Sequence, residues 1–431
     1  MRSLWPNDRP AEALVRWRAI SSAPSTQTDA ATAVDAPPEP LDTRFGPRLR
    51  RLVREGGAKS IAFRLVRFRL RQAEEALRTL EGGRTAPPWD ETRARQHLHQ
   101  IVGHRAARLV EVRQPLVLIS QVQRSGGTLL SQLFDHHPQL HAHPHELHTG
   151  HPNKEAWPVL DLSRPSEWFH ILYERPAKRS FNEGYRKLVS LKAAAEDEGE
   201  AFPFVFPPSA QKMLFDLCVA QWQPSSSRGV FDCYMTSYFN AWLDNRNLYE
   251  RDKRWVTAFA ARLSHHPESV EGLFDTYPDG RLISIVRDPR SWYLSARGYR
   301  DIDPSERRER DYGTIEAATA LWVESSEAML AARELYGDRF RAVVFEDLLT
   351  EPEETMRSLA AYLGIDYDSI LIRPTFNGLP IKADSSFAVT GHGVSSEPLT
   401  RWRSRLQPEE IAYIEEHALP LYERVVEGAR R

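Results

Sequence analysis

Apolar and polar positions change their spacing along the chain, and the change is clearest after residue 113. Four short apolar runs, at 116–119, 255–260, 282–286 and 342–345, have the length and composition of buried strands. Longer segments with helical spacing lie between them. Because strands alternate with helices, the pattern predicts an α/β fold with a central, mostly parallel sheet and helices on both faces.

Two of the intervening helices carry clear signals at their ends. A long helix is predicted between Thr314 and Tyr336, and Gly337 is expected to end it. The segment Thr-Glu-Pro-Glu at 350–353 indicates a capping box with an early proline, which opens a helix that Gly364 ends.

The residues before the first strand follow a different pattern. Residues 1–45 are rich in Pro, Ala, Ser and Thr after a short helical stretch, so we expect a flexible tail and linker. Residues 46–112 are expected to form a helical extension that includes a basic amphipathic helix at 57–80. Such a helix lies on a membrane surface, binds a partner, or docks on the main domain with its arginines solvated. The main domain is expected to cover 113–431.

Composition places the chain among globular proteins with a sizeable core. Hydrophobic residues make up 41% of its 431 residues and charged residues 27%. The formal net charge of −2 provides no global basic field and argues against a nucleic-acid partner. Two cysteines are too few for a disulfide framework or a structural zinc site, which favours a reducing compartment. No apolar run approaches the roughly 20 residues of a membrane span, and the first residues lack a signal-peptide core, so we expect a cytoplasmic location.

The turn after the first strand carries the most informative chemistry. An apolar run leads into Gln-Val-Gln-Arg-Ser-Gly-Gly-Thr at 121–128, and an amphipathic helix follows at once. Backbone N–H groups of such a turn converge on an anion together with the positive end of the helix. The turn adds one guanidinium, two hydroxyls and two flexible glycines: Arg124, Ser125, Thr128, Gly126 and Gly127.

This turn differs from the phosphate loop of kinases that use ATP and magnesium. The kinase pattern requires Gly at position 121 and Lys at position 127, where this chain has Gln121 and Gly127. The strand at 282–286 also lacks a terminal acidic ligand for magnesium, because Arg287 precedes Asp288. A kinase therefore stays an alternative, and the sequence favours an anion site that needs no metal.

A second anion site is predicted where the strand at 282–286 ends. Arg287 stands at the strand end, and Ser295 lies eight residues further on, inside the helix that follows. A guanidinium and a hydroxyl in these positions hold one phosphate from two sides, with roughly 1.5–3 kcal/mol for each charge-assisted bond. The alternative is a surface ion pair between Arg287 and Asp288, which contributes little.

Taken in order, these motifs resemble those of sulfotransferases that use 3′-phosphoadenosine 5′-phosphosulfate (PAPS). In that family an Arg-Ser-Gly-Thr-Thr-like loop after the first strand binds the 5′-phosphosulfate, as 124–128 would here. A later Arg-(Asp/Asn)-Pro strand end, with Ser eight residues further on, binds the 3′-phosphate, and 287–295 matches it. Phe-Glu-Asp-Leu at 345–348 is similar to the family's Tyr-Glu-Asp-Leu segment, and 385–403 to its C-terminal cofactor-closing segment. The resemblance covers about 114–420.

The resemblance implies a P-loop-like three-layer domain that transfers a sulfuryl group from PAPS to a hydroxyl. The product would be 3′-phosphoadenosine 5′-phosphate (PAP), and no metal would be required. The implied cofactor-binding residues are Arg124, Ser125, Gly126, Gly127, Thr128, Leu129, Arg287, Ser295 and Arg401. The loop departs from the family because Gln121 and Gln123 replace the usual Gly and Pro, and Gly127 replaces a threonine. One hydroxyl contact is therefore expected to be missing or to come from Ser125.

Glu146 is the expected catalytic base. In the carbohydrate and tyrosylprotein branches of the family, a Glu shortly after a comparable His-Pro segment has this role, and Glu146 matches it to within a residue or two. His145 is the second candidate, because imidazole titrates near neutral pH. Arg124 is expected to stabilise charge on the departing phosphate. Seven histidines within 136–151 allow a zinc or nickel site as an alternative, but the family chemistry needs none.

The acceptor is less well indicated by the sequence. Residues 150–250 lack a clear period and are rich in aromatic side chains, so we expect irregular structure there that forms the walls of a substrate pocket. The Glu-type base and these aromatics favour a saccharide or glycolipid, since sugars stack on aromatic faces: Trp222, Trp242, Tyr234 and Phe239. Arg262 is either a further cofactor contact or an ordinary surface arginine. The remaining alternative is a non-catalytic, membrane-associated scaffold organised by 57–80.

Overall fold

The computed structural model describes residues 91–148, 156–173, 185–186, 201–250, 252–302, 310–382 and 393–430. The chain forms two compact units, Met1–Gln100 and Ile101–Arg431, and most of the first falls outside the described residues. The predicted tail at 1–45 and basic helix at 57–80 also lie outside them. The account below therefore concerns the second unit.

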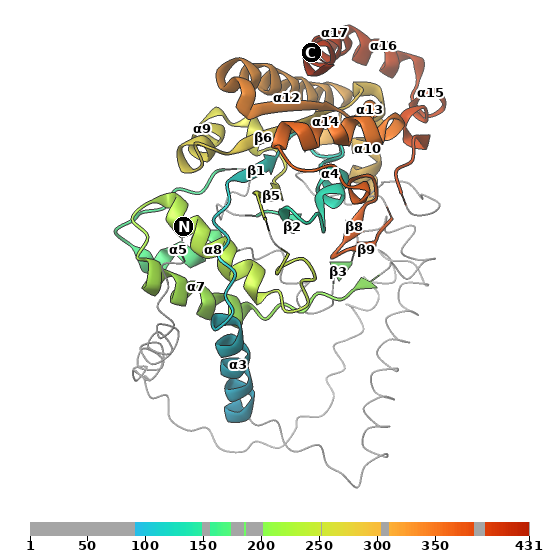
Figure 1. Cartoon of the computed structure of the whole chain (residues 1–431). Helices are drawn as coiled ribbons and strands as arrows, with labels where there is room; N and C mark the ends of the chain where they lie inside the picture. The colour runs from blue at the N-terminus through green and yellow to red at the C-terminus, as the bar shows by residue number, and fades with distance from the viewer. Residues whose placement is uncertain are drawn as a thin grey trace, which may run out of the picture. The chain divides into compact units, whose positions relative to one another are not determined.

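A parallel sheet forms the centre of this unit (Figure 1). Within the described residues it has five strands, in the order β2 (Leu140–Glu146), β5 (Trp255–Phe259), β1 (Leu116–Ile119), β6 (Arg281–Val286) and β7 (Phe340–Val344). Each neighbouring pair runs parallel. β1 is buried along its whole length, and β5 and β6 are buried after their first residue, as expected for a sheet covered by helices. The predicted α/β class and strands are confirmed, except that Phe345 starts a helix.

Helices pack on this sheet and form the core with it. Leu130 and Leu133 of α4 (Gly127–Phe134) and Met356 and Leu359 of α14 (Pro352–Leu363) share one hydrophobic cluster with residues of β1, β6 and β7. Other helices, α12 (Ile315–Tyr336) and α17 (Leu419–Arg430), pack against β7 and against each other. The first strand lies in the middle of the sheet, so the turns that follow β1 and β6 meet at one edge.

The predicted ends of the two helices have different outcomes. Thr314 caps α12, since its hydroxyl accepts a hydrogen bond from Ala317 N at 3.2 Å, and Gly337 follows the helix as predicted. α14 begins with Pro352 and ends before Gly364, which has φ of 63°. The capping box itself is wrong: Thr350 is the last residue of α13 (Phe345–Thr350), and its hydroxyl donates to Glu346 O at 3.0 Å.

The described part of 150–250 is largely helical, so the expectation of irregular structure is wrong there. This part contains α5 (Pro165–Leu172), α7 (Pro208–Trp222) and α8 (Ser227–Ala241) (Figure 1). α8 is buried from residue 230 to residue 241, and a helix that is buried on all sides shows no amphipathic period in its sequence.

The remaining elements are short or peripheral. The helices are α3 (Glu91–Ala106), α9 (Pro267–Thr276), α10 (Pro289–Ile302), α15 (Trp402–Arg405) and α16 (Pro408–His417). Two antiparallel pairs are β3 (Tyr185–Arg186) with β4 (Ala201–Phe202) and β8 (Thr375–Phe376) with β9 (Leu379–Pro380). Short 3₁₀ helices cover Leu263–His265, Gly337–Arg339, Ser369–Ile372 and Glu397–Leu399. Among the described helices, none has both the length and the hydropathy that a bilayer crossing requires.

Candidate functional site

The turn between β1 and α4 is built to expose backbone N–H groups. Arg124 and Gly126 have φ of 70° and 105°, so the chain reverses through the left-handed region twice. A Cβ on Gly126 would also lie 2.6 Å from the Phe345 ring, so glycine is required there for both conformation and space. The first intrahelical bond runs from Leu130 N to Gly126 O, and the N–H groups before it have no partner within the helix. They form the positive end of α4.

Two arginines meet beside this turn. Arg287, directly after β6, donates from Nη1 to Arg124 O at 2.8 Å and from Nε to Ser291 Oγ at 2.9 Å. Arg124 in turn donates from Nε to Ser295 Oγ at 3.4 Å. The structure therefore brings together three of the residues that the sequence placed at two anion sites.

Arg287 is buried, and burial changes the pKa of its guanidinium. Desolvation lowers its pKa to about 10, the nearby charge of Arg124 acts in the same direction, and Glu346 opposes both. A guanidinium with this pKa is still protonated at neutral pH. Its Cζ lies 4.5 Å from the centre of the Phe345 ring, so an aromatic face covers one side of the cation.

Glu346 links Arg287 to the end of the chain. Its Oε1 accepts from Asp288 N at 3.0 Å, and its Oε2 accepts from the Tyr422 hydroxyl of α17 at 2.9 Å. Burial raises the pKa of this carboxyl group. Tyr422 is a site residue that sequence reasoning missed, because nothing near it in the sequence indicates a partner in the segment 345–348.

The loop also holds a buried hydroxyl that fits an anion. Ser125 Oγ is fully enclosed and has no hydrogen-bond partner among the described residues. Thr128 is half-buried, whereas the Leu129 side chain belongs to the hydrophobic core, so only the backbone of Leu129 can face a ligand. The donors here, with two guanidiniums beside them, suit a phosphate or sulfate group.

Glu146 lies at the same edge of the sheet as the loop. It is the last residue of β2, and its register partner on β5 is Phe259. The Phe259 ring packs beside Gly127, because a Cβ on that glycine would lie 2.3 Å from the ring. The Glu146 side chain is 30% exposed, and its Oε2 lies 3.8 Å from His148 Nε2. A carboxylate is thus accessible next to the loop, with an imidazole beside it that sequence reasoning did not select.

The side chain of His145 contacts Tyr238 and Phe204. Its Nε2 lies 2.9 Å from the Tyr238 hydroxyl, and its ring packs edge-on against Phe204 with centroids 5.2 Å apart. The other β2 histidines pack in the same way: His141 against Phe239 at 5.1 Å and His143 against Tyr238 at 4.6 Å. No group of three or more potential metal ligands occurs among the described residues.

Arg262 contacts the start of the turn, and Arg401 lies close enough to Arg287 to act on its charge. Arg262 is 7% exposed, donates to Gln123 Oε1 and forms an ion pair with Asp311, so the alternative of an ordinary surface arginine is wrong. Its bond to Gln123 supports the loop from behind. Arg401 pairs with Glu397 at 2.6 Å, and its charge is close enough to lower the pKa of Arg287.

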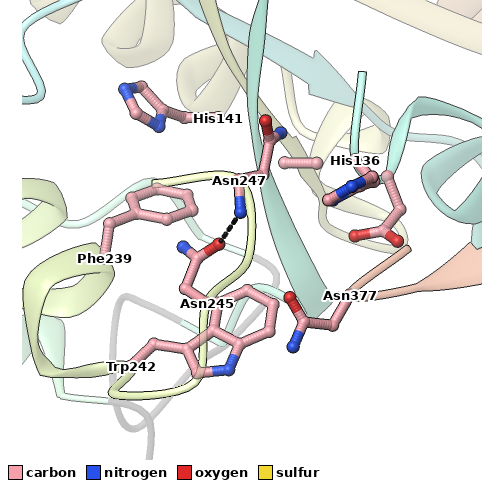
Figure 2. A pocket seen from close by; sticks show the side chains of 9 residues that line it. His136, His141, Phe239, Trp242, Asn245, Asn247 and Asn377 are labelled. Carbon is pink, nitrogen blue, oxygen red and sulfur yellow. Dashed lines mark hydrogen bonds between the residues drawn. The ribbon is translucent and has the colours of Figure 1, made fainter. Parts of the chain in front are cut away.

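A separate polar cavity lies at the other end of α4 (Figure 2). Since α4 has eight residues, this cavity is roughly 12 Å along the helix axis from the loop. Its lining comes from β2, from the end of α8 and from the β8–β9 turn: Asp135, His136, His141, Ala142, Phe239, Trp242, Asn245, Asn247 and Asn377.

Three polar atoms in this cavity lack hydrogen-bond partners among the described residues: His136 Nδ1, His141 Nε2 and Trp242 Nε1. Burial lowers the pKa of His141 to about 3, so its imidazole is neutral. Burial also raises the pKa of Asp135, although Thr375 Oγ1 and Gly378 N donate to its carboxylate. The cation nearest to the lining is Lys253, which donates to Asn247 Oδ1 at 2.7 Å and whose pKa burial lowers to about 7.

The four aromatic residues proposed as a sugar platform do not form an exposed surface. Tyr234, Phe239 and Trp242 are at most 2% exposed and build the core around α8. The Trp222 ring is covered by the guanidinium of Arg113, whose Cζ lies 3.7 Å from the ring centre. Burial of these side chains argues against a stacking platform, and the saccharide acceptor stays a prediction.

Comparisons with known proteins agree with the motifs. Residues 115–369 match a family model described as the sulfotransferase family. A search of curated proteins found no match.

Several solved structures are similar to the chain. A sulfotransferase domain from the curacin biosynthetic pathway has 15% identity and a TM-score of 0.38, over 71% of this chain and 98% of that one. A sulfotransferase from Alicyclobacillus acidocaldarius has 14% identity and a TM-score of 0.38, over 74% and 97%. A mouse sulfotransferase complexed with PAP has 10% identity and a TM-score of 0.32, over 75% and 91%.

Proposed function

The chain belongs to the sulfotransferase family, since more than half of it matches that family's model, and we propose that it moves a sulfuryl group from PAPS to a hydroxyl of a small-molecule acceptor. The observation that carries this proposal is the convergence of Arg124, Arg287 and Ser295 beside a helix N-terminus. One doubly phosphorylated nucleotide would satisfy all of these groups.

The residues divide into two groups for binding the nucleotide. Arg287 and Ser295 would hold its 3′-phosphate, with Phe345 and Glu346 keeping the Arg287 guanidinium in place. The N–H groups at the start of α4 and the hydroxyls of Ser125 and Thr128 would hold the 5′ end. PAPS supplies a sulfuryl group that its bond to phosphate already activates.

Arg124 has a distinct role because it belongs to both groups. Its carbonyl accepts from Arg287, and its side chain reaches Ser295. A guanidinium in this position would stabilise the negative charge that grows on the phosphate as the sulfuryl group leaves. Arg401 would add positive charge on the same side.

Glu146 would remove the proton from the acceptor hydroxyl. Its side chain is accessible, and its Oε2 lies 3.8 Å from His148 Nε2. Its register partner on β5, Phe259, packs beside the loop. His145 is the weaker candidate, because the Tyr238 hydroxyl already occupies its Nε2. The arrangement of the domains and a peripheral membrane contact through 57–80 stay predictions.

Calorimetric titration of the full chain with PAP and, separately, with ATP and magnesium tests the proposal. We expect PAP to bind without any metal and ATP with magnesium to bind far more weakly. The reverse preference would support the kinase. Vesicle binding that depends on 57–80, with no affinity for either nucleotide, would support the scaffold.

A further inference from the structure

Gln121 is a polar residue enclosed at the start of the anion loop. Its side chain is completely buried, and neither Nε2 nor Oε1 has a hydrogen-bond partner among the described residues. Its backbone oxygen accepts from Arg262 N at 2.9 Å, which holds the residue in place. A buried amide without partners is costly, so it needs a reason to be there.

The position of this amide gives that reason. Gln121 Nε2 lies 2.3 Å from the point where a Cβ on Gly127 would stand, and Phe259 closes the same space from the other side. Gly127 is the first residue of α4, where the N–H groups have no partner within the helix. The Gln121 amide thus takes the place of the side chain that residue 127 lacks.

We propose that Gln121 is a positioning residue for the nucleotide, and that its side-chain amide donates a hydrogen bond to the 5′-phosphate held by the loop. The proposal rests on the function proposed above. A carboxamide offers two N–H donors. Rotation about its last side-chain bond exchanges the amide nitrogen and oxygen, so the group can turn its N–H donors towards the phosphate. The glutamine at 121 and the glycine at 127 are then one coupled replacement, in which a donor moves from one position of the loop to the other.

Calorimetric titration of the variant Gln121→Met tests this role, because methionine keeps the length and the unbranched shape. We expect the Kd for PAP and for adenosine 5′-monophosphate to rise by about tenfold or more, the loss expected for one bond to a charged group. The Kd for adenosine 3′-monophosphate should not change. The melting temperature of the unliganded protein should not fall, because no hydrogen bond within the protein is lost.

Gln132 provides a matched control. It is also buried, its amide also lacks partners among the described residues, and it lies on the second turn of α4, away from the loop. Gln132→Met should bind PAP as the wild type does. If Gln121→Met does not fold, Gln121→Glu has the same shape and should weaken PAP binding even more, because it places a negative charge beside the phosphate.

Two outcomes separate this inference from the proposed function. Unchanged PAP binding by a folded Gln121→Met or Gln121→Glu variant would overturn the role of Gln121 and leave the sulfotransferase proposal intact. An equal loss for the 3′- and 5′-monophosphates would also overturn it, because a 5′-specific contact cannot produce that result. Failure of the wild type to bind PAP would overturn both.

Discussion

The two ends of α4 contain polar groups of the same kind in opposite electrostatic surroundings. At its start, Ser125 Oγ and the Gln121 amide are buried without partners among the described residues, and two guanidiniums lie beside them. At its end, His136 and His141 have unpartnered nitrogens as well, but their neighbour is the carboxyl group of Asp135.

The difference shows that unpartnered polar atoms do not by themselves make a nucleotide site. The cavity end has less positive charge, because burial holds the pKa of His141 at about 3 and lowers the pKa of Lys253 to about 7, where its ammonium group is only partly protonated. The loop end keeps its charge, since burial lowers the pKa of Arg287 only to about 10. Charge that survives burial is what selects a phosphate.

The largest effect is expected at Glu146, on the loop side. Glu146→Gln should reduce turnover by roughly 10²–10⁴-fold, the usual contribution of a general base, because the amide cannot accept the acceptor proton. PAP affinity should stay within about twofold, since the substitution leaves the arginines intact. Transfer of labelled sulfate from PAPS to a pool of small-molecule alcohols measures the first quantity, and calorimetry the second.

His145→Gln is the comparison variant for that test. It removes the imidazole that contacts Tyr238 and should retain most of the turnover. If His145→Gln loses more turnover than Glu146→Gln, the assignment of the base is wrong. His145 would then be the catalytic base.

A smaller effect is expected when the charge at the loop is removed. Arg287→Ala should weaken PAP binding by about 100-fold, because two charge-assisted hydrogen bonds to a phosphate are lost. Arg281→Ala is the matched control: it lies on the same strand at the opposite edge of the sheet, against Trp255 and Tyr362. Equal losses in the two variants, measured by calorimetry, would contradict the assignment of Arg287 to the nucleotide site.

The smallest effect concerns stability at the cavity end. The pKa of His141 is about 3 in the folded protein, below the ordinary value of 6.5, so between these values the unfolded state binds more protons. The free energy of unfolding should therefore fall as the pH is lowered from 6.5 towards 3, by on the order of 1 kcal/mol between pH 6.5 and pH 5.

Denaturant titrations over that pH range check this prediction. His141→Leu should remove that part of the pH dependence and leave PAP affinity unchanged. A pH dependence in His141→Leu that equals the wild type would show that the imidazole is solvated.

The sheet could be predicted from the sequence because each strand is a continuous apolar run, which is how a strand covered on both faces must look. α8 could not, since a helix buried from residue 230 to residue 241 has no polar face to reveal its period. The prediction of a capping box at 350–353 was wrong for a different reason. The Thr350 hydroxyl had a competing partner, the carbonyl of Glu346, in the preceding helix.

The residues of the candidate site also divide into those in local sequence motifs and those brought together only by folding. Arg124, Arg287 and Ser295 could be selected because each lies in a local motif: the turn after β1, the end of β6, and the helix that follows β6. The bond from Tyr422 to Glu346 joins distant segments, so only the folded chain reveals it. The sequence shows that Gln121 departs from the loop pattern. Its contact with Gly127 depends on how the loop folds in three dimensions, which the spacing of residues in the sequence does not predict.

The contact between Tyr422 and Glu346 makes α17 a support for the residues proposed to bind the nucleotide. A polypeptide shortened before Leu419 would leave a buried carboxylate with one partner fewer, next to the guanidinium that it steadies. Fusion partners and purification tags joined at the carboxyl terminus would act on that support, even though hundreds of residues separate them from the first strand.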